Sequence, residues 1–406
     1  MSYLFTRFRA LLPHYFAKHP SHELKELYFS VGIMDFATSA VALFEPIYLW
    51  TRGYSFAQIA MFYGAVYLLY TVLLPLGGRI AARFGFEHSI LTSQFAFIAY
   101  YIALFALPQF SWLIYVAPLL FAIQKSLYWP AYHADFTIFS AREQRGQEIS
   151  GVLTVSAVAT ILGPIFGGII LNFLGFGPLF LIVAALFLAS TRPLLKLKEI
   201  HDPAPFTYNK YWKLLWKPSH RRSAIAYFGY AEELVALVFW PIFLYLTVSE
   251  YSELGLLIGA ATFGTMLLVL GIGKLTDRAP QPGVLTFGSI AVSIVWLVRT
   301  AVSLTPFRLF LLDTIGRTSK NTVTVPLMSM TYEHGIREDP LAIAVYFEQA
   351  LAIGKMLICA VLIGVAAIAP STTAAFQLTF FIAALASLLY RLLTPPGPLG
   401  MLHKQP

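Results

Sequence analysis

The chain has 406 residues, of which 58% are hydrophobic and 12% are charged, and its formal net charge is +8 at pH 7. Soluble domains carry about 25% charged residues. This composition therefore excludes an ordinary soluble domain and indicates a membrane protein. The single cysteine, Cys359, has no second cysteine with which to form an internal disulfide.

Apolar runs long enough to cross a bilayer follow one another along the whole chain. A transmembrane helix needs about 20 apolar residues, and these runs are too long and too apolar to be strands of a membrane barrel. We expect an all-α membrane protein with twelve transmembrane helices. They are predicted at residues 25–50, 57–78, 88–108, 111–137, 149–173, 176–192, 223–247, 254–274, 282–303, 308–331, 341–367 and 372–393.

One predicted connection is long, polar and basic, and it contains prolines: residues 193–222. It divides the chain into residues 1–192, a six-helix bundle preceded by a basic N-terminal tail, and residues 223–406, a second six-helix bundle with a C-terminal tail. We expect the segment between them to be a cytoplasmic linker. The two bundles are expected to be pseudo-symmetric.

The basic residues predict the orientation. If the N-terminus is cytoplasmic, most of the 28 Lys and Arg residues lie in the inner loops and tails, and only Arg52, Arg299 and Arg308 lie on the outer side. Cytoplasmic loops of membrane proteins are enriched in these residues. We therefore expect a multi-pass protein of the inner or plasma membrane with both termini in the cytoplasm, and no nucleic acid as a partner.

Three pairs of segments repeat at one offset of 195 positions. "VALFEPIYL" (41–49) aligns with "ALVFWPIFL" (236–244), "GRIAAR" (78–83) aligns with "GKLTDR" (273–278), and Lys125 aligns with Lys320. Three anchors that share one offset indicate two parallel repeats. Transporters built in this way place the substrate site between the repeats, near the middle of the membrane.

With this repeat and the loop after the second span, the chain resembles the major facilitator superfamily. The family pattern in that loop is Gly-x-x-x-Asp-Arg-x-Gly. "GRIAARFGFEH" keeps Gly78, Arg83 and Gly85, with Ala82 at the acidic position, and the second copy keeps Gly273, Asp277 and Arg278. The resemblance implies that these residues take part in the conformational change of transport.

"GPIFGG" in the fifth span resembles a pattern of the family's antiporters, chiefly drug:proton exporters. It supplies Gly163, Pro164, Gly167 and Gly168, and the resemblance implies proton-coupled efflux. Packing is the alternative interpretation, because Gly163 and Gly167 form a small-xxx-small face that lets two helices approach closely, and Pro164 would kink the helix.

Charged residues inside the predicted spans mark candidate sites, since a charge at the bilayer centre costs at least ~2.5–3.5 kcal/mol. Most lie in spans 1, 4, 7 and 10, which line the central cavity in the resembling family. Glu45 and Arg299 lie nearer the outer surface, where we expect them to snorkel. The interior set is Asp35, Lys125, Glu232, Glu233, Asp313, Arg317, Lys320, Glu348 and Lys355.

Two roles are predicted for these residues. Substrate binding is expected for Lys125 with Tyr128 and Tyr132 on one helical stripe, and for Arg317 and Lys320. We expect Lys125 and Lys320, as equivalent residues, to face each other and to bind a negative group. Proton coupling is expected for the acidic residues Asp35, Glu232, Glu233, Asp313 and Glu348.

The competing hypothesis is a set of structural ion pairs, with Lys125 bound to Asp35 and Lys320 bound to Glu232 or Glu233. Asp313 and Arg317 can pair one turn apart. Glu348 and Lys355 are too far apart along one helix to touch, so each should contact another helix. His133 is interpreted as an interfacial residue.

The function that these features favour is secondary active transport of a small solute by alternating access, as proton-coupled efflux. A proton symporter or uniporter that imports an anionic or zwitterionic solute is the first alternative, and a non-transporting sensor or accessory subunit is the second. No phosphate-binding loop and no Cys/His cluster is found in the sequence. We therefore expect no enzyme activity, no metal and no cofactor. The expected partners are the solute, protons and lipid, and we expect a monomer.

Overall fold

The computed structural model describes residues 22–140, 146–194, 206, 213–214, 216–276, 280–301 and 305–393. The basic N-terminal tail, most of the linker, and Asp277 and Arg278 lie outside these residues. Within them the chain is helical and contains no strand. The first half comprises α2 (His22–Ala42), α3 (Glu45–Thr51), α4 (Phe56–Phe84), α5 (Phe86–Ala106), α6 (Leu113–Ser140), α7 (Gly146–Leu174) and α8 (Phe176–Leu194).

The second half begins with a run of short helical segments and continues with long helices. The segments are α10 (Pro218–Tyr227), η1 (Phe228–Tyr230), α11 (Ala231–Leu234), η2 (Val235–Phe239) and α12 (Trp240–Val248). The long helices are α13 (Tyr251–Thr276), α14 (Gln281–Ala301), α15 (Pro306–Arg337), α16 (Pro340–Ile368) and α17 (Thr372–Ser387), which continues into η3 (Leu388–Leu392).

The predicted all-α membrane fold class is confirmed, and each of the twelve predicted spans coincides with one helix or with consecutive helical segments of the described chain. Nine runs in the described part of the chain are long and apolar enough to cross a membrane, and α8 contributes a shorter apolar helix. The helices α6 and α15 are not in that set. Both helices carry charged residues within the predicted spans, Lys125 in α6 and Asp313, Arg317 and Lys320 in α15.

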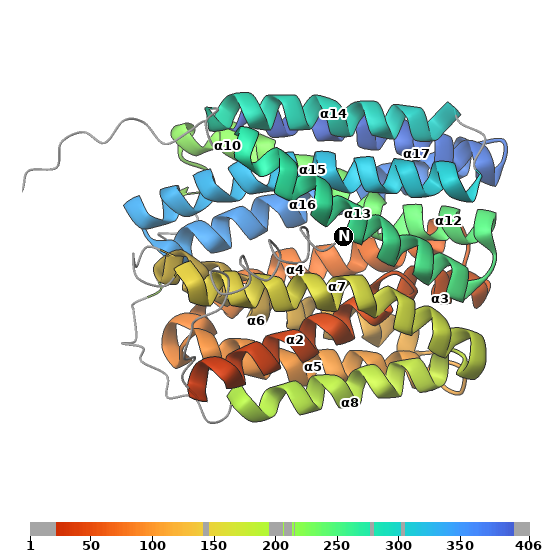
Figure 1. The fold of residues 1–406 in the computed structure, drawn as a ribbon, viewed down its shortest axis with the longest axis horizontal. Coiled ribbons are helices and arrows are strands. Elements are labelled where there is room, and N and C mark those ends of the chain that lie inside the picture. The colour runs from red at the N-terminus through yellow and green to blue at the C-terminus, as the bar shows by residue number, and fades with distance from the viewer. Residues whose placement is uncertain are drawn as a thin grey trace, which may run out of the picture.

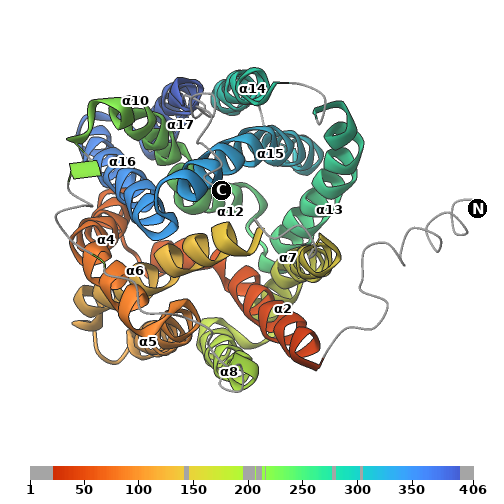
Figure 2. The same ribbon diagram turned by 90° about the vertical axis from the view of Figure 1, so that its left-hand side faces the viewer.

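The helices lie side by side in two groups, α2–α8 and α10–α17 (Figure 1). The view along the helices in Figure 2 shows α4 beside α16 and α7 beside α13, and these two pairs make the largest contacts between the halves. The helices α6 and α15 also meet near the middle. We call the end where α8 stops and α10 starts the linker end, and the opposite end the far end.

The repeat predicted from the sequence has a structural counterpart in the first span of each half. The helix breaks at Leu43–Phe44, just before Glu45–Pro46, and its equivalent changes to a π-helix over Val235–Phe239, just before Trp240–Pro241. A proline has no N–H group to donate to the carbonyl four residues earlier. Pro46 and Pro241 therefore disturb both spans at equivalent points, 195 positions apart.

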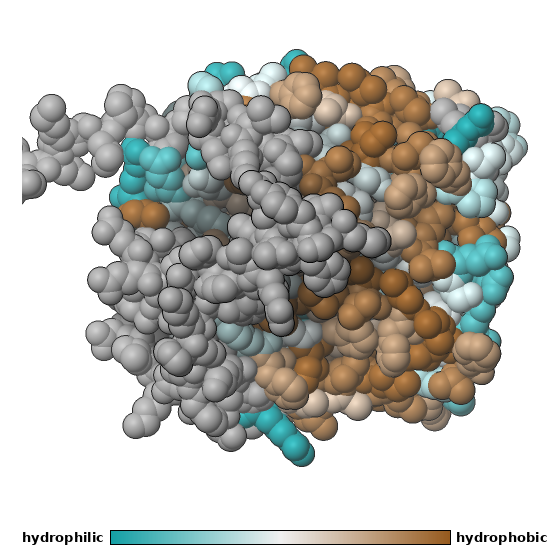
Figure 3. All heavy atoms as spheres, viewed as in Figure 1, coloured by the Kyte–Doolittle hydropathy of each residue, from teal (hydrophilic) through white to brown (hydrophobic). Residues whose placement is uncertain are grey.

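The outer surface is apolar around the middle of the molecule, as a bilayer requires. Figure 3 shows the hydrophobic side chains as a broad band, with hydrophilic residues at the far end. The exposed side chains include large apolar ones such as Val72, Phe95, Ile294 and Leu385. Lipid tails would cover them, so the exposed apolar surface is consistent with the multi-pass membrane protein predicted from composition.

The "GPIFGG" glycines lie where α7 is packed between α2 and α13. A Cβ atom on Gly167 would lie 1.9 Å from the carbonyl oxygen of Ala40 in α2, and one on Gly168 would lie 2.3 Å from that of Tyr251 in α13. A Cβ on Gly255 of α13 would in turn lie 2.3 Å from the Pro164 carbonyl. Close packing on both sides of α7 is thus sufficient to require these glycines.

The residues of the loop motif after the second span differ in their surroundings. Gly85 has a φ of 97°, which favours glycine, and it separates α4 from α5. A Cβ on Gly78 would lie 2.8 Å from the Val345 side chain of α16, across the boundary between the halves. Arg83 is exposed, with its guanidinium carbon 5.3 Å from the centre of the Phe84 ring. Gly273 lies in α13.

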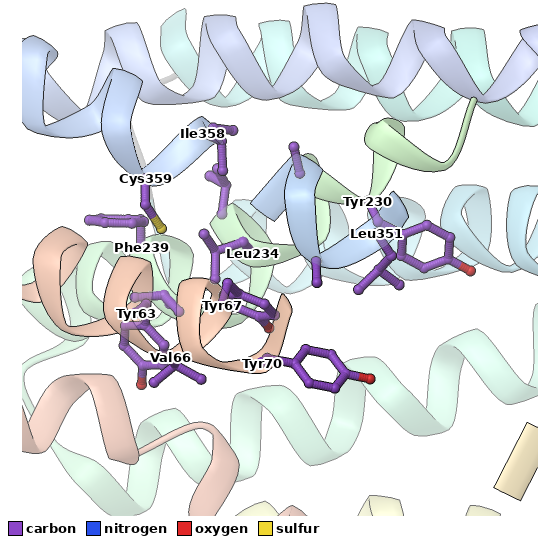
Figure 4. Close-up of a cluster of buried hydrophobic side chains, with 14 of the residues drawn as sticks. Tyr63, Val66, Tyr67, Tyr70, Tyr230, Leu234, Phe239, Leu351, Ile358 and Cys359 are labelled. Atoms are coloured by element: carbon purple, nitrogen blue, oxygen red, sulfur yellow. The ribbon is translucent and has the colours of Figure 1, made fainter. Parts of the chain in front are cut away.

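A buried cluster joins α4, α16 and the irregular span that contains Glu232 and Glu233. Figure 4 shows Tyr63, Val66, Tyr67 and Tyr70 of α4 beside Leu351, Ile358 and Cys359 of α16, with Tyr230, Leu234 and Phe239 from that span. The phenol rings are therefore held in a packed core between the two halves. Tyr67 contacts Lys355, and Tyr70 contacts Glu348.

Candidate functional site

Glu232 of α11 is the centre of a polar group within the second half. Its carboxylate forms an ion pair with Lys320 of α15 and accepts hydrogen bonds from Trp296 Nε1 at 3.0 Å and Tyr390 Oη at 3.1 Å. The Lys320 ammonium also lies against the rings of Tyr230 and Tyr390, at 4.7 and 4.6 Å from their centres. Of the two structural partners predicted for Lys320, the structure selects Glu232.

Asp313 of α15 is the centre of a second group in the same half. Arg317 Nε donates to its carboxylate at 2.5 Å, which confirms the predicted pairing one turn apart, and Trp240 Nε1 donates at 3.0 Å. Arg299 Nη2 lies 3.6 Å from the same carboxylate. A buried aspartate is thereby surrounded by two cations and one neutral donor.

The expectation that Arg299 and Glu45 snorkel to the surface is wrong. Arg299 is 6% exposed, and its guanidinium lies 3.9 and 4.3 Å from the ring centres of Trp240 and Trp296. Glu45 is 5% exposed and accepts a hydrogen bond from Tyr63 Oη at 2.8 Å. Inward-facing aromatic and phenolic partners stabilise both groups inside the bundle, so neither needs to reach water.

The third paired group involves both halves of the molecule. Lys355 of α16 donates to Glu233 of α11 at 2.7 Å. Its ammonium lies 5.3 Å from the ring centre of Tyr67, which belongs to α4 in the other half, and 5.7 Å from that of Tyr230. Lys355 thus contacts another helix, as predicted, and places a compensated charge at the boundary between the halves.

Glu348 of α16 bridges the two halves directly. Tyr70 Oη of α4 donates to Glu348 Oε2 at 2.7 Å, and His133 Nε2 of α6 lies 3.0 Å from Glu348 Oε1. The other ring nitrogen of His133, Nδ1, lies 3.0 Å from Tyr332 Oη of α15. His133 is 7% exposed and Glu348 is 3% exposed, so this hydrogen-bonded group, which we call the Glu348 bridge, is buried.

His133 is the residue that the sequence interpretation misplaced. It lies inside the boundary between the halves, with polar and aromatic neighbours that include Tyr332, Glu348, Trp129 and Phe347. The available signal was its place after the Lys125, Tyr128 and Tyr132 stripe on α6. Its acidic partner is 215 positions away in the chain, and no local pattern predicts such a contact.

Lys125, which is half-buried, differs in its contacts from Lys320 and Lys355. Its ammonium lies 4.5 Å from the ring centre of Phe121 and 5.7 Å from that of Tyr67, and within the described residues it makes no ion pair and no hydrogen bond. The proposed partner Asp35 instead accepts a hydrogen bond from Ser156 of α7. The structural pair predicted between Lys125 and Asp35 is therefore not formed.

The other predicted members of the substrate stripe lie next to Lys125 on α6. The rings of Tyr128 and Tyr132 are stacked, with centres 5.6 Å apart. Across the boundary, the lysine that shares the Tyr67 ring with Lys125 is Lys355, whereas Lys320 lies against Tyr230 and Tyr390. Lys125 therefore shares a ring with Lys355, and not with Lys320 as the repeat predicted.

The halves are in contact at both ends of the bundle. At the far end, Asn172 Nδ2 of α7 donates to Glu250 Oε1 and Ser252 Oγ, each at 2.9 Å, and the Phe56 and Phe239 rings are 4.5 Å apart. At the linker end, the Phe136 and Tyr332 rings are 5.1 Å apart. Access to the boundary from either side therefore requires one set of contacts to separate.

No metal centre is indicated by the geometry of the described part of the chain. Within those residues, no group of three or more His, Cys, Asp or Glu side chains could hold a metal ion. The buried acidic residues instead contact lysine, arginine, histidine, tyrosine, tryptophan or serine side chains. Such groups can exchange protons or bind charged parts of a small molecule.

Comparison with known proteins gives one family and one fold. The family model of the Major Facilitator Superfamily matches residues 27–334. The solved structure of a mutant of the nucleoside transporter NupG is similar, with a TM-score of 0.70 and 13% sequence identity, over 91% of this chain and 98% of that chain. No curated protein sequence matches. At this level of identity the structural likeness concerns the fold alone.

Proposed function

Because the chain belongs to the Major Facilitator Superfamily, and is thus a multi-pass membrane transporter and not an enzyme, we propose that it couples solute movement to protons by alternating access. The observation that supports proton coupling is the Glu348 bridge. It joins an acidic residue of one half to a histidine and a tyrosine of the other, inside the membrane. Protonation can therefore change the contact between the halves.

The coupling follows from the change that opening imposes on Glu348. When the halves separate at the linker end, Glu348 loses His133 and Tyr70, and its carboxyl group meets water or remains neutral. A carboxylate forms stronger hydrogen bonds than a neutral acid, so proton binding weakens the bridge. A proton thus favours one conformation over another, as a ligand does when it binds two states differently.

The other predicted proton acceptors have contacts of a different kind. Asp313 and Glu232 form ion pairs within the second half, and Asp35 accepts a hydrogen bond within the first half. Glu233 is paired with Lys355 at the boundary. We propose Glu348 as the main coupling residue and Glu233 as the second, because separation of the halves changes the surroundings of these two most.

The direction of transport is a separate proposal. The resemblance of "GPIFGG" to antiporters favours efflux, but the close packing of α7 on α2 and α13 is a sufficient reason for those glycines. The alternative, cotransport of an anion with a proton, is favoured by Lys125, which makes no ion pair among the described residues and lies within electrostatic range of Glu348. Efflux is thus the direction that the sequence pattern favours, and cotransport is the mode that the contacts of Lys125 favour.

Proton flux in liposomes tests this function. The purified protein is reconstituted with a pH-sensitive dye inside the vesicles, and a panel of organic anions, cations and neutral solutes is added outside. We expect at least one solute to move protons in the wild type. Glu348→Gln should abolish the solute-driven proton flux and keep solute exchange.

The matched control is Glu338→Gln, because Glu338 belongs to the same half but its side chain is 36% exposed and pairs with Lys217. This variant should behave as the wild type does. Full proton coupling in Glu348→Gln would contradict the proposed coupling residue. Absence of any solute-driven flux in the wild type would favour the sensor or accessory subunit.

The orientation is proposed from the distribution of basic residues. Lys217 is exposed at the linker end and Glu253 at the far end. With the linker in the cytoplasm, a membrane-impermeant thiol reagent added outside intact cells should label Glu253→Cys and leave Lys217→Cys unlabelled. The reverse labelling pattern would overturn the proposed topology.

A further inference from the structure

We infer that Lys125 is the centre of a binding site for a small organic anion with one negative charge, and that this anion binds best when Glu348 carries a proton. The inference rests on the proposed transport function, and it adds the substrate class and the link between substrate and proton. It depends on the contacts of Lys125, on its surroundings from both halves and on the nearest acidic residues.

The ammonium group of Lys125 has no ionic partner among the described residues. Lys125 contacts only ring faces among the described residues, whereas the equivalent Lys320 forms an ion pair with Glu232. The position in the first half that is equivalent to Glu232 is occupied by Ala37, which is buried. The first repeat therefore has the cation without its acidic partner. A charge inside the membrane is costly without a partner, so a ligand is the expected source of the compensating charge.

Lys125 lies at the boundary between the two halves. Tyr67 of α4 lies beneath both Lys125 and Lys355, with its ring centre 5.7 and 5.3 Å from the two ammonium groups. The charge of Lys355 is compensated by Glu233 at 2.7 Å. One positive charge in this pair of lysines is thus left over, and the ligand that matches it has a single negative charge.

Three acidic residues act electrostatically on Lys125 without pairing with it. Glu348, Glu45 and Glu233 are within electrostatic range of its ammonium, but each has its own contacts. Glu45 binds Tyr63, Glu233 binds Lys355, and Glu348 binds Tyr70 and His133. An ionised Glu348 would repel an anion that approaches Lys125, and a protonated Glu348 would not.

Linkage follows from this repulsion. If a proton on Glu348 increases the affinity for the anion, the bound anion must increase the affinity for the proton by the same factor. Proton and anion then cross together, which is cotransport. The ionisable groups that face Glu348 are Lys125 and His133 of α6, Tyr70 of α4, Tyr332 of α15, Lys355 of α16 and Tyr230 of η1.

The aromatic surroundings suggest the rest of the ligand. Lys125 lies against Phe121 and Tyr67, and Tyr128, Trp129 and Tyr132 follow on the same helix with their rings in contact. Ring faces accept flat apolar groups by stacking. The class that fits is an aromatic carboxylate or sulfonate, in which a planar body bears one negatively charged group.

Binding to the purified full-length protein tests the inference without transport. The probes are benzoate and benzenesulfonate, with benzamide as the neutral match and benzylammonium as the cationic match, each followed by thermal shift and titration at mildly acidic and mildly alkaline pH. We expect only the two anions to stabilise the wild type, and more strongly at acidic pH. Equal binding of both anions would show that the site recognises the negative charge. Binding of only one would show that it recognises the carboxylate or the sulfonate group itself.

Three variants test which residues are responsible for anion binding and for its pH dependence. Lys125→Gln should weaken anion binding by about 10- to 100-fold, as expected for loss of a hydrogen bond to a charged group, and Lys125→Arg should restore it in part. Glu348→Gln should bind the anion with equal affinity at both pH values. The control Lys217→Gln, at an exposed lysine outside the site, should match the wild type.

The outcomes separate the inference from the function on which it rests. Anion binding that disappears in Lys125→Gln supports the site even if no transport is observed. Proton-driven transport of a cation or neutral solute that is unchanged in Lys125→Gln would support the transport function and overturn the site. Anion binding of wild-type affinity in folded Lys125→Gln, or no stabilisation of the wild type by either anion, would also overturn it.

Discussion

In the second half of the transporter, Lys320, Lys355 and Asp313 each contact an oppositely charged side chain. In the described part of the first half, Lys125, Asp35 and Glu45 contact only neutral groups, which are aromatic rings, the Ser156 hydroxyl and the Tyr63 hydroxyl. The difference separates two uses of a charge inside the helical bundle. Away from the boundary between the halves, a paired charge stabilises the fold, whereas a charge with neutral contacts is available to a ligand or a proton.

The two repeats show how this difference arose along the chain. Lys125 and Lys320 are equivalent, but the position of Glu232 is Ala37 in the first repeat. Likewise, Glu45 is equivalent to Trp240, whose indole donates to Asp313. Residues at equivalent positions of the two repeats thus have different partners.

The largest expected effect comes from breaking a paired group in the second half. Asp313→Ala leaves the buried guanidinium of Arg299 and the more exposed Arg317 without their counter-charge and leaves the Trp240 indole N–H without its acceptor. Removal of one partner from a buried ion pair costs about 3–5 kcal/mol. We expect the thermal melting temperature of Asp313→Ala to fall steeply.

The matched variant in the first half is Asp35→Ala, which removes an acid whose described contact is one hydroxyl group. It should cost about 1 kcal/mol, the contribution of one hydrogen bond. Equal losses of stability in the two variants would show that the two halves do not use Asp313 and Asp35 differently.

The next effect compares two lysines that share the Tyr67 ring. Lys355→Gln leaves Glu233 unpaired and should destabilise the protein by about 3 kcal/mol. Lys125→Gln removes a cation that has no described acidic partner, and it should leave the melting temperature of the ligand-free protein unchanged or raise it. A larger loss of stability in Lys125→Gln than in Lys355→Gln would contradict the assignment of Lys125 as the unpaired cation.

The smallest effect concerns the contact between the halves. Tyr332→Phe removes only the hydroxyl group that lies 3.0 Å from His133 Nδ1 and keeps the ring that contacts Phe136. Loss of one hydrogen bond should reduce stability by about 0.5–1.5 kcal/mol. The pH dependence of transport should shift in the same variant, whereas Tyr227→Phe, which removes a hydroxyl bound to Thr331 within the second half, should leave it unchanged.

The sequence is sufficient to predict the spans, the two repeats and the residues that need partners inside the membrane. These predictions hold because length and apolar character determine whether a helix crosses a bilayer. The partners themselves could not be derived. Glu232 and Glu233 are adjacent, so a helix turns them about 100° apart, and the π-helix that follows changes the winding further.

Position along a span also misled the interpretation of Arg299 and Glu45. A residue near the end of a span can send its side chain toward water or toward the core, and the choice depends on neighbours that are distant in sequence. The Trp240 and Trp296 rings hold the Arg299 side chain toward the core, and the Tyr63 hydroxyl does the same for Glu45. The link between His133 and Glu348 depends on the packing of α6 against α16.

The most direct test of the account is the pH dependence of the distance between α6 and α15 at the linker end. Spin labels at Ile138→Cys and Ile336→Cys occupy exposed positions on these helices, and Cys359 is 1% exposed and should not react. Pulsed electron resonance should give a short distance at alkaline pH and a growing population of longer distances as the pH falls. In Glu348→Gln the distribution should be the same at every pH. A distribution that widens with acid in Glu348→Gln as it does in the wild type would contradict the claim that a proton on Glu348 separates the two halves.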